Sequence, residues 1–306
     1  MGVRKMSHGN PSGSSPFVAL LGTAQDGGIP QVGCRCARCA AARTDASMRR
    51  MASSLLIADP LFHTRHLIDA TPSFPEQVEH AERFLPRTTD GVSRQPLFDG
   101  ILLSHAHIGH YAGLMYLGRE TYAARGQRVH ATESMGAFLR ANGPWGMLIA
   151  QGNISLERLD AGATLHLSER VSILPFAVPH RGEYSDTCGY VIEGPGKRVL
   201  YVPDTDTWGN WTTPIEEWIA SVDIALLDGT FYDNVELRGR SVQEIPHPRI
   251  SQSIARLSAM SAVERRKIHF IHLNHTNNAA DVESLEWHAV HDAEMHIGRD
   301  GERFWI

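Results

Sequence analysis

The sequence predicts an α/β sandwich, with β-sheets inside and helices outside. Two observations support this fold class. Short apolar, strand-like segments recur along the whole chain, and helical patterns lie between them. The chain has 306 residues, 42% of them hydrophobic and 21% charged, which is enough for a sizeable core. Because no interdomain linker is evident, we expect a single folded domain over residues 16–306.

The ends and the charge of the chain exclude several classes of protein. Residues 1–15 are polar and rich in Gly, Ser and Pro, so we expect a disordered tail without a secretion signal. No run of 18 apolar residues could form a spanning helix. The net charge of −5 does not favour a nucleic-acid partner. We therefore expect a cytoplasmic protein that contacts neither membrane nor nucleic acid and is compatible with a homodimer.

The first half of the chain begins with strand signals and continues with helices. Glycine-rich TAQDGG follows the first strand, and the apolar segment PLFDGILLSHAH runs from a strand into a histidine loop. The expected strands are Phe17–Gly22, 53–58 and 66–69, and the expected helices are 37–50, 74–85, 112–125 and 133–142.

The second half repeats this interleaving of strands and helices. The segment KIHFIHLNHTN is an apolar strand that ends in polar residues able to bind metals. The expected strands are 171–175, 189–192, 199–202, 223–227 and two short ones at the end of the chain, EMHIG and ERFWI. The expected helices are 213–220, 249–263 and 280–291.

Histidines cluster where one predicted strand ends. His105 and His107 alternate on an extended segment, so both side chains can point the same way, and His110 follows in the next turn. Imidazole is the commonest transition-metal ligand in proteins. Although a chain with 17 histidines can contain such a cluster by chance, its place at a strand end favours a metal site.

Three further strands end in residues of the same chemistry. His180 follows ILPFAVP, Asp204 follows RVLYVP and His272 follows KIHFI. Each residue alone is weak support, because a lone histidine at a strand end is more often a structural polar group. Together with HAHIGH they predict one metal centre.

These residues resemble the metallo-β-lactamase superfamily, whose motif HxHxDH is followed by a distal His, a bridging Asp and a final His. The segments LGTAQDGGIPQVGCRCARC, LLDGTFY and HLNHTN resemble, within it, the relatives of coenzyme PQQ synthesis protein B and of phosphonate-pathway cyclic phosphodiesterases. The resemblance implies an αββα sandwich of two mixed sheets flanked by helices. It also implies metal ligands at His105, His107, His110, His180, Asp204 and His272.

One residue departs from the motif. Gly109 stands where the family has the Asp of HxHxDH, and a glycine cannot coordinate a metal. The resemblance then leaves a first site of His105, His107, His180 and Asp204, and a second, weaker site of His110, Asp204 and His272 that can be empty. Asp206 is a candidate replacement ligand for the second site.

Three cysteines lie close together near the N-terminus. The spacing of Cys34, Cys36 and Cys39, in a chain without an export signal, suggests a metal rather than disulfides, with free thiols as the alternative. The resemblance suggests His275 as the fourth ligand of a closed, structural zinc site.

The resemblance implies a metal-dependent hydrolase of a phosphodiester, ester or lactone, with a small, anionic substrate. Zn²⁺ is the expected metal, with Mn²⁺ or Fe²⁺ as alternatives at the active site. Asp204 would orient the nucleophile, and His247 matches the proton-donating histidine of related phosphodiesterases, although a surface loop histidine is an equal alternative. An iron-dependent oxygenase of cofactor biosynthesis and a non-catalytic binding protein remain alternatives. Asp69 is a candidate anchor of the metal-binding histidines, with a turn residue as the equal alternative. Candidates around the pocket are Glu183, Tyr184, Asp186, Trp145, Trp208 and Arg119, although such aromatic residues more often only pack and a helix arginine is more often a solvated charge.

Overall fold

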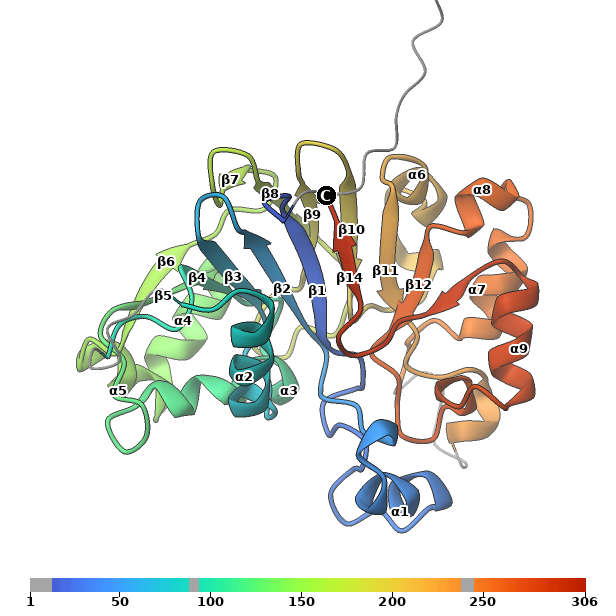
Figure 1. Ribbon diagram of the computed structural model, residues 1–306, viewed down its shortest axis with the longest axis horizontal. Helices are drawn as coiled ribbons and strands as arrows, with labels where there is room; N and C mark the ends of the chain where they lie inside the picture. The colour runs from blue at the N-terminus through green and yellow to red at the C-terminus, as the bar shows by residue number, and fades with distance from the viewer. Residues whose placement is uncertain (1–12, 88–93, 238–244) are drawn as a thin grey trace, which may run out of the picture.

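The computed structural model describes residues 13–87, 94–237 and 245–306. Two seven-stranded sheets form the centre of the molecule, and helices cover their outer faces (Figure 1). The expected sandwich of two mixed sheets flanked by helices is confirmed. Residues 1–12 of the predicted tail lie outside the described residues, so the tail stays a prediction.

The first sheet is built mainly from the N-terminal half of the chain. Its strand order is β14-β1-β2-β3-β4-β5-β6, with β14 from the C-terminus beside β1. Strands β3 to β6 run parallel to one another, whereas β2 is antiparallel to both β1 and β3. The bounds are Phe17–Gly22 (β1), Ser54–Asp59 (β2), Thr64–Ile68 (β3), Gly100–Leu102 (β4), Gln127–Ala131 (β5), Ile154–Arg158 (β6) and Arg303–Trp305 (β14).

The second sheet is built from the C-terminal half. Its strand order is β13-β12-β11-β10-β9-β8-β7. Strands β10 to β13 run parallel to one another, and β9 is antiparallel to both β8 and β10. The bounds are Leu165–His166 (β7), Ser172–Ala177 (β8), Cys188–Glu193 (β9), Arg198–Val202 (β10), Ile224–Asp228 (β11), Ile268–Ile271 (β12) and His296–Ile297 (β13).

Strand β1 shows why the central strands are apolar throughout. Val18 and Leu20 belong to the core between the two sheets, where Ile192 and Tyr201 of the second sheet also lie. Phe17 and the other alternate residues of β1 belong to the core between the first sheet and its helices. Because successive side chains of a strand point to opposite faces, both sets are buried.

Helices α2 to α5 pack on the first sheet, and α6, α7 and α9 on the second. Local sequence sets their starts: a Pro lies in the first turn of α2, and the Ser284 side chain accepts a hydrogen bond from the Trp287 N–H at the start of α9, at 3.0 Å. The bounds are Ala37–Thr44 (α1), Phe74–Phe84 (α2), Ile108–Tyr111 (α3), Glu133–Ala141 (α4), Trp145–Ala150 (α5), Ile215–Ala220 (α6), Ile250–Leu257 (α7), Ala262–Arg265 (α8) and Leu285–Asp292 (α9).

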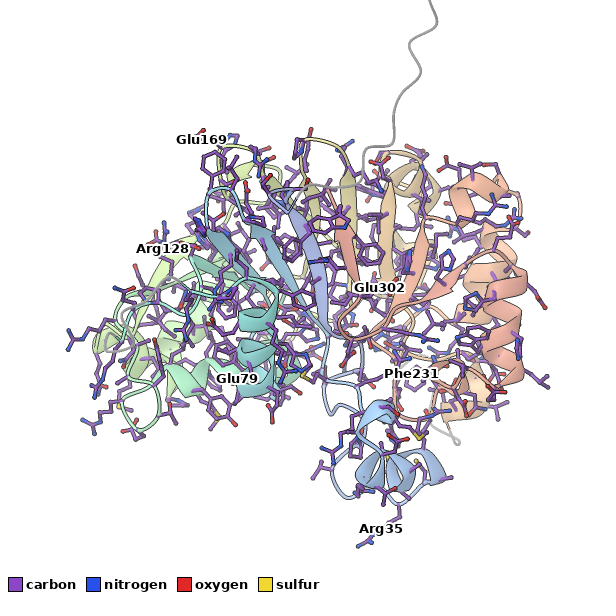
Figure 2. The ribbon with its side chains drawn as sticks, in the orientation of Figure 1. Arg35, Glu79, Arg128, Glu169, Phe231 and Glu302 are labelled. Carbon is purple, nitrogen blue, oxygen red and sulfur yellow. The ribbon has the colours of Figure 1, made fainter. Side chains whose placement is uncertain are left out.

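Helix α1 stands apart from the sheets. In Figure 1 its segment protrudes at the end of the sandwich where β1 and β12 end, and Figure 2 shows Arg35 at its outer tip. No helix in the described part of the chain is long and apolar enough to cross a membrane.

Several expected helices are shorter than predicted. The helix expected over 112–125 is wrong: a 3₁₀ turn over Ala112–Leu117 ends at Gly118, whose carbonyl accepts hydrogen bonds from both Thr121 and Ala123. The helix expected over 249–263 is two helices, because Ser261 caps the start of α8. The helix expected over 37–50 ends at Thr44, and that over 280–291 begins only at Leu285. Strands β5 and β6 were not expected at all.

Candidate metal centre

The carboxyl ends of several strands meet at one edge of the sandwich. Strands β3 and β4 are parallel, as are β10, β11 and β12, so the residues that follow them come together. The structure places all six predicted active-site ligands in segments that follow strands: His105, His107 and His110 follow β4, His180 follows β8, Asp204 follows β10 and His272 follows β12.

Four of these residues surround one point. Asp204 Oδ2 lies 3.4 Å from His105 Nε2, 3.2 Å from His180 Nε2 and 3.8 Å from His107 Nδ1. The four ligand atoms lie within 4.8 Å of one another. Ligands of a tetrahedral Zn²⁺, at about 2.0–2.1 Å from the ion, are themselves about 3.3–3.4 Å apart. The arrangement therefore fits the expected first metal site.

Buried atoms without hydrogen-bond partners point into this centre. Leaving such an atom unpaired costs roughly 1–3 kcal/mol, so native proteins rarely tolerate several together. Divalent cations held among these side chains would satisfy them. Those atoms are His105 Nε2, His110 Nε2, His272 Nε2, Asp204 Oδ1 and Asp26 Oδ1.

Asp69 holds two of the imidazoles in the orientation that a metal requires. Its Oδ2 accepts a hydrogen bond from His110 Nδ1 at 2.7 Å and another from the Ser104 hydroxyl at 2.8 Å. Since that hydroxyl donates to Asp69, it accepts from His105 Nδ1 at 2.9 Å. Both imidazoles then carry their proton on Nδ1 and present a lone pair on Nε2. Asp69 is fully buried with φ of 65°, a conformation that is strained for a non-glycine residue.

Asp228 performs the same task on the other sheet. Its Oδ1 accepts a hydrogen bond from the Thr230 hydroxyl at 2.7 Å, and that hydroxyl accepts from His272 Nδ1 at 2.8 Å. Its Oδ2 accepts from the Thr205 N–H and from His247 Nδ1, at 3.1 Å and 2.8 Å. Because both oxygens are occupied by donors, Asp228 positions the two histidines rather than offering a ligand atom.

Two further carboxylates orient His180 and His107. Asp206 Oδ1 lies 3.1 Å from His180 Nδ1, and Glu183 Oε2 lies 3.0 Å from His107 Nε2. Asp206 therefore supports the first group of ligands, and the expectation that it replaces the missing motif carboxylate at the second site is wrong. The chain turns it toward His180 because its N–H donates to the Pro179 carbonyl, at 2.7 Å.

A second group of ligand atoms lies beside the first. His110 Nε2 and His272 Nε2 face Asp26 Oδ1 at 3.4 Å and 3.6 Å, and His110 Nε2 lies 3.8 Å from Asp204 Oδ2. The expected residues His110, Asp204 and His272 are brought together here, and Asp26 is an additional residue that was not among the predicted ligands. Asp26 also lines a polar cleft of about 530 Å³, bordered by Gln25, Gln31, Glu236, Asn274 and Thr276.

His247 lies deep in the centre rather than in a surface loop. Its side chain is only 5% exposed, and its Nδ1 is 3.2 Å from Asp204 Oδ1. Burial opposes a charge on this imidazole, but the carboxylates of Asp228 and Asp204 raise the pKa of His247 to about 9. The imidazole is therefore protonated at neutral pH in this arrangement of side chains.

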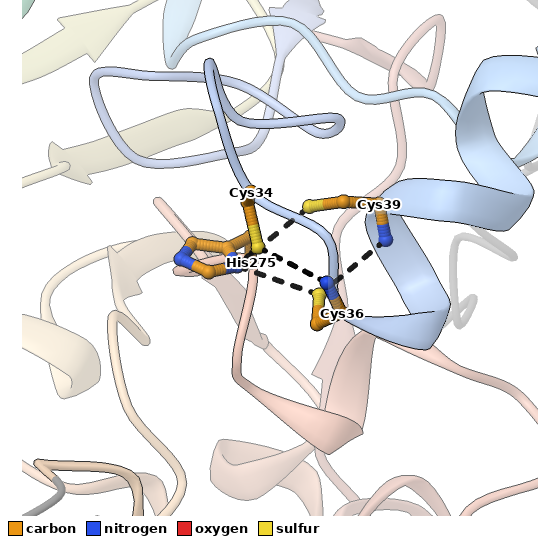
Figure 3. A group of neighbouring side chains, drawn as sticks. All are labelled: Cys34, Cys36, Cys39 and His275. Carbon is orange, nitrogen blue, oxygen red and sulfur yellow. Dashed lines mark hydrogen bonds between the residues drawn. The ribbon is translucent and has the colours of Figure 1, made fainter.

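Three cysteines and His275 form a separate cluster (Figure 3). His275 Nδ1 lies 3.4 Å from Cys34 Sγ and 3.7 Å from both Cys36 Sγ and Cys39 Sγ. A tetrahedral Zn²⁺ with Zn–S of about 2.3 Å and Zn–N of about 2.0 Å separates S from N by about 3.5 Å. Burial and the neighbouring thiols raise the pKa of Cys39 to about 11, whereas, against the effect of burial, hydrogen bonds lower that of Cys36 to about 6, so Cys39 is the thiol that needs a cation to ionise at neutral pH. The geometry fits the expected Cys₃His site.

Other candidate residues take structural roles. Asp186 accepts hydrogen bonds from Thr132 and Ser134, and the Trp208 indole donates to Ser253 at 2.8 Å. Arg119 pairs with Glu120 at the surface, at 2.8 Å. Tyr184 is exposed and packs on Phe138, which also contacts Trp145. None of these contacts reaches the ligand atoms.

The comparisons with known proteins agree with this geometry. The sequence pattern of the Beta-lactamase superfamily domain matches residues 64–273, well over half of the chain. The chain therefore belongs to the β-lactamase superfamily.

Within that superfamily, the chain is similar to proteins named for one pathway. Coenzyme PQQ synthesis protein B of Methylorubrum extorquens (strain PA1) is 26% identical, over 90% of this chain and 97% of its own. The protein of the same name from Pseudomonas protegens is 27% identical, over 93% and 98%.

Two solved structures share the fold. Zn²⁺-bound PqqB from Methylobacterium extorquens has a TM-score of 0.80 at 24% identity, covering 95% of this chain and 100% of its own. A diphosphatase from the PhnP family has a TM-score of 0.66 at 20% identity, covering 95% and 97%. At these identities the structures support the fold and leave the reaction open.

Proposed function

We propose that this protein is a metal-dependent hydrolase that cleaves a phosphodiester, ester or lactone. The observation that carries the proposal is the convergence of His105, His107, His180 and Asp204 on one point. The buried His105 Nε2 and Asp204 Oδ1 have no hydrogen-bond partner there. A zinc ion held there would supply a hydroxide from water near neutral pH and polarise the oxygen of the scissile group. Zn²⁺ is the favoured ion, because imidazole nitrogens and a carboxylate are among its common ligands.

Asp204 connects the two groups of ligands. Its Oδ2 faces His105 and His180 and is also 3.8 Å from His110, so one carboxylate reaches both positions. The side chain is almost fully buried, and although burial opposes its charge, His247 and His180 hold its pKa well below the usual range. A charged carboxylate at this place accepts a hydrogen bond from a nucleophilic water and so fixes the direction in which the water attacks.

His247 supplies the proton for the leaving group in this proposal. The carboxylate of Asp228 accepts from Nδ1, at 2.8 Å, so Nε2 is the nitrogen left to protonate an oxygen of the substrate. A hydrolysis that expels an alkoxide needs such a donor, since an alkoxide is a poor leaving group. The two active-centre cation positions and His247 together favour a small, anionic substrate.

An oxygenase of cofactor biosynthesis is the second candidate. The likeness to coenzyme PQQ synthesis protein B, over 90% of this chain and 97% of that protein, supports a role in cofactor biosynthesis. The oxygenase requires redox-active iron at the first group of ligands and consumption of O₂, neither of which a zinc hydrolase needs. A protein that binds a ligand without turnover is the third candidate.

A substrate panel separates these candidates. We expect zinc- or manganese-loaded protein to cleave bis-p-nitrophenyl phosphate or a simple ester or lactone, and His107→Ala to lose at least about 100-fold of that activity. The exposed His166→Ala is the matched control and should retain it. Fully loaded protein that cleaves no phosphodiester, ester or lactone would rule out the hydrolase, and O₂ uptake with Fe²⁺ would favour the oxygenase.

A further inference from the structure

The space beside Gly109 is already filled by another carboxylate. Gly109 stands in α3 at the motif position where family members carry an Asp. A Cβ placed on it would lie 2.2 Å from Asp26 Oδ1 and 2.5 Å from Asp26 Cβ. Such distances are far below van der Waals contact. A side chain at residue 109 would therefore overlap Asp26 and force it to move.

Asp26 presents its carboxylate in the way a ligand would. Its Oδ1 is buried without a hydrogen-bond partner, and it lies 3.4 Å from His110 Nε2 and 3.6 Å from His272 Nε2. These separations exceed ordinary N–H···O distances and match those between two ligands of one tetrahedral ion, about 3.3–3.4 Å. Asp26, His110 and His272 thus form a group able to hold a cation.

Backbone hydrogen bonds fix the loop that carries Asp26. The Gln25 N–H donates to the Leu273 carbonyl at 2.9 Å, next to His272, and the Gly28 N–H closes a turn onto the Gln25 carbonyl at 2.8 Å. The Asn274 side chain also donates to the Gln25 side chain. The Asp26 main chain is therefore anchored to the end of β12, the strand that delivers His272.

We propose that Asp26 replaces the motif carboxylate missing at Gly109 and completes a second metal site with His110, His272 and Asp204. The ligand has moved from the histidine loop to the loop after β1, and the glycine makes room for it. The motif alone suggests that Gly109 weakens the second site. In this proposal a ligand from a different segment completes that site instead. The inference rests on the proposed metal centre and deepens it.

A complementary pair of substitutions tests the proposal directly. Zinc content and the affinity of the weakest site are measured for the full chain by elemental analysis and by competition with a chelating dye. We expect the wild-type chain to hold one zinc among His105, His107, His180 and Asp204, one among Asp26, His110 and His272, and one at the Cys₃His cluster. Asp26→Ala should bind the zinc at His110 and His272 at least about 100-fold more weakly. Gly109→Ala should weaken the same site, because its Cβ displaces Asp26.

The double variant Asp26→Gly/Gly109→Asp should restore the lost zinc, since removing the Asp26 side chain frees the space for a carboxylate at residue 109. Glu79→Ala, an exposed carboxylate of α2 (Figure 2), is the matched control and should bind like the wild type. Unchanged affinity of the weakest site in Asp26→Ala, or no restoration in a folded double variant, would overturn the proposal. Metal binding is read without turnover, so failure of the hydrolase proposal would show separately, as loaded protein without activity.

Discussion

His247 Nδ1 lies 2.8 Å from Asp228 Oδ2, and both side chains are buried at the end of β11 and in the segment that follows it. This pair fixes which nitrogen of His247 can serve the substrate. In Asp228→Asn, an amide group that can also donate a hydrogen bond would lie opposite the Nδ1 proton. His247 would then lose the carboxylate that orients it and balances its charge.

We expect Asp228→Asn to slow hydrolysis in a way that depends on the leaving group. Proton donation contributes about 10²–10⁴-fold to such reactions, and it matters little when the leaving group is a nitrophenolate. The rate on an alkyl ester or alkyl phosphodiester should therefore fall by at least about 100-fold, while the rate on the p-nitrophenyl analogue falls far less. Asp228 also supports His272 through Thr230, so zinc content is measured alongside, and an equal loss on both substrates at full zinc occupancy would show that His247 does not donate the proton.

The Asp69 carboxylate orients His110 directly and His105 through Ser104. Asp69→Asn removes the carboxylate that accepts from His110 and from Ser104, so two imidazoles lose their fixed orientation. Loss of such a supporting partner costs about 10–100-fold in metal affinity. Zinc competition titrations should show this weakening at the active centre while the zinc at the Cys₃His cluster stays bound. Undiminished affinity would contradict the role assigned to Asp69.

The Cys₃His cluster should stabilise the fold without taking part in the reaction. It ties the segment before α1 to His275, at the end of the loop that follows β12. We expect a zinc chelator to lower the Tm of the wild type, and Cys39→Ser to have a lowered Tm that the chelator hardly changes further. Cys188→Ala, a buried cysteine outside the cluster, is the control and should keep the chelator-dependent shift. A Cys39→Ser variant with wild-type Tm and zinc content would refute this role.

Acid sensitivity should arise partly from a histidine far from the metal centre. Burial, with smaller contributions from His130 and Arg128, lowers the pKa of His66 in β3 from 6.5 to about 3. The folded state keeps this imidazole neutral, whereas the unfolded chain protonates it below about pH 6.5. The stability that the neutral form contributes is present above that pH and is lost as the pH falls toward 3, by up to about 1.4 kcal/mol per pH unit.

Denaturant unfolding at pH 7, 6, 5 and 4 tests this expectation. His66→Gln should flatten the fall in unfolding free energy between pH 6.5 and 4, whatever its effect at pH 7. The exposed His166→Gln should leave the slope unchanged. Equal falls in unfolding free energy for His66→Gln and the wild type between pH 6.5 and 4 would contradict this role of His66.

Strand ends were the most informative feature of the sequence. Apolar runs that stop at His105, His180, Asp204 and His272 predicted both the strands and the convergence of ligands, because strands that run in the same direction through a sheet deliver their carboxyl ends to one edge. The Cys₃ spacing likewise predicted the approach of His275 through the family resemblance.

Residues whose position depends on packing between segments could not be predicted this way. Asp26 lies 84 positions before His110, and contacts between distant segments, such as the pairing of the Gln25 backbone with Leu273, place it there. A signal was present in the glycine-rich TAQDGG loop after β1, but nothing local shows which way its carboxylate points. Asp228, at the end of LLDGTFY, is distinguished from a turn residue only by the four donors that surround it.

Anomalous diffraction from crystals of the purified, zinc-loaded protein tests the central claim most directly. The account predicts a peak bonded to His105 Nε2, His107 Nδ1, His180 Nε2 and Asp204 Oδ2 at about 2.0–2.2 Å, together with a peak at the Cys₃His cluster. A map with the Cys₃His peak and no anomalous density among those three histidines and Asp204 would contradict it.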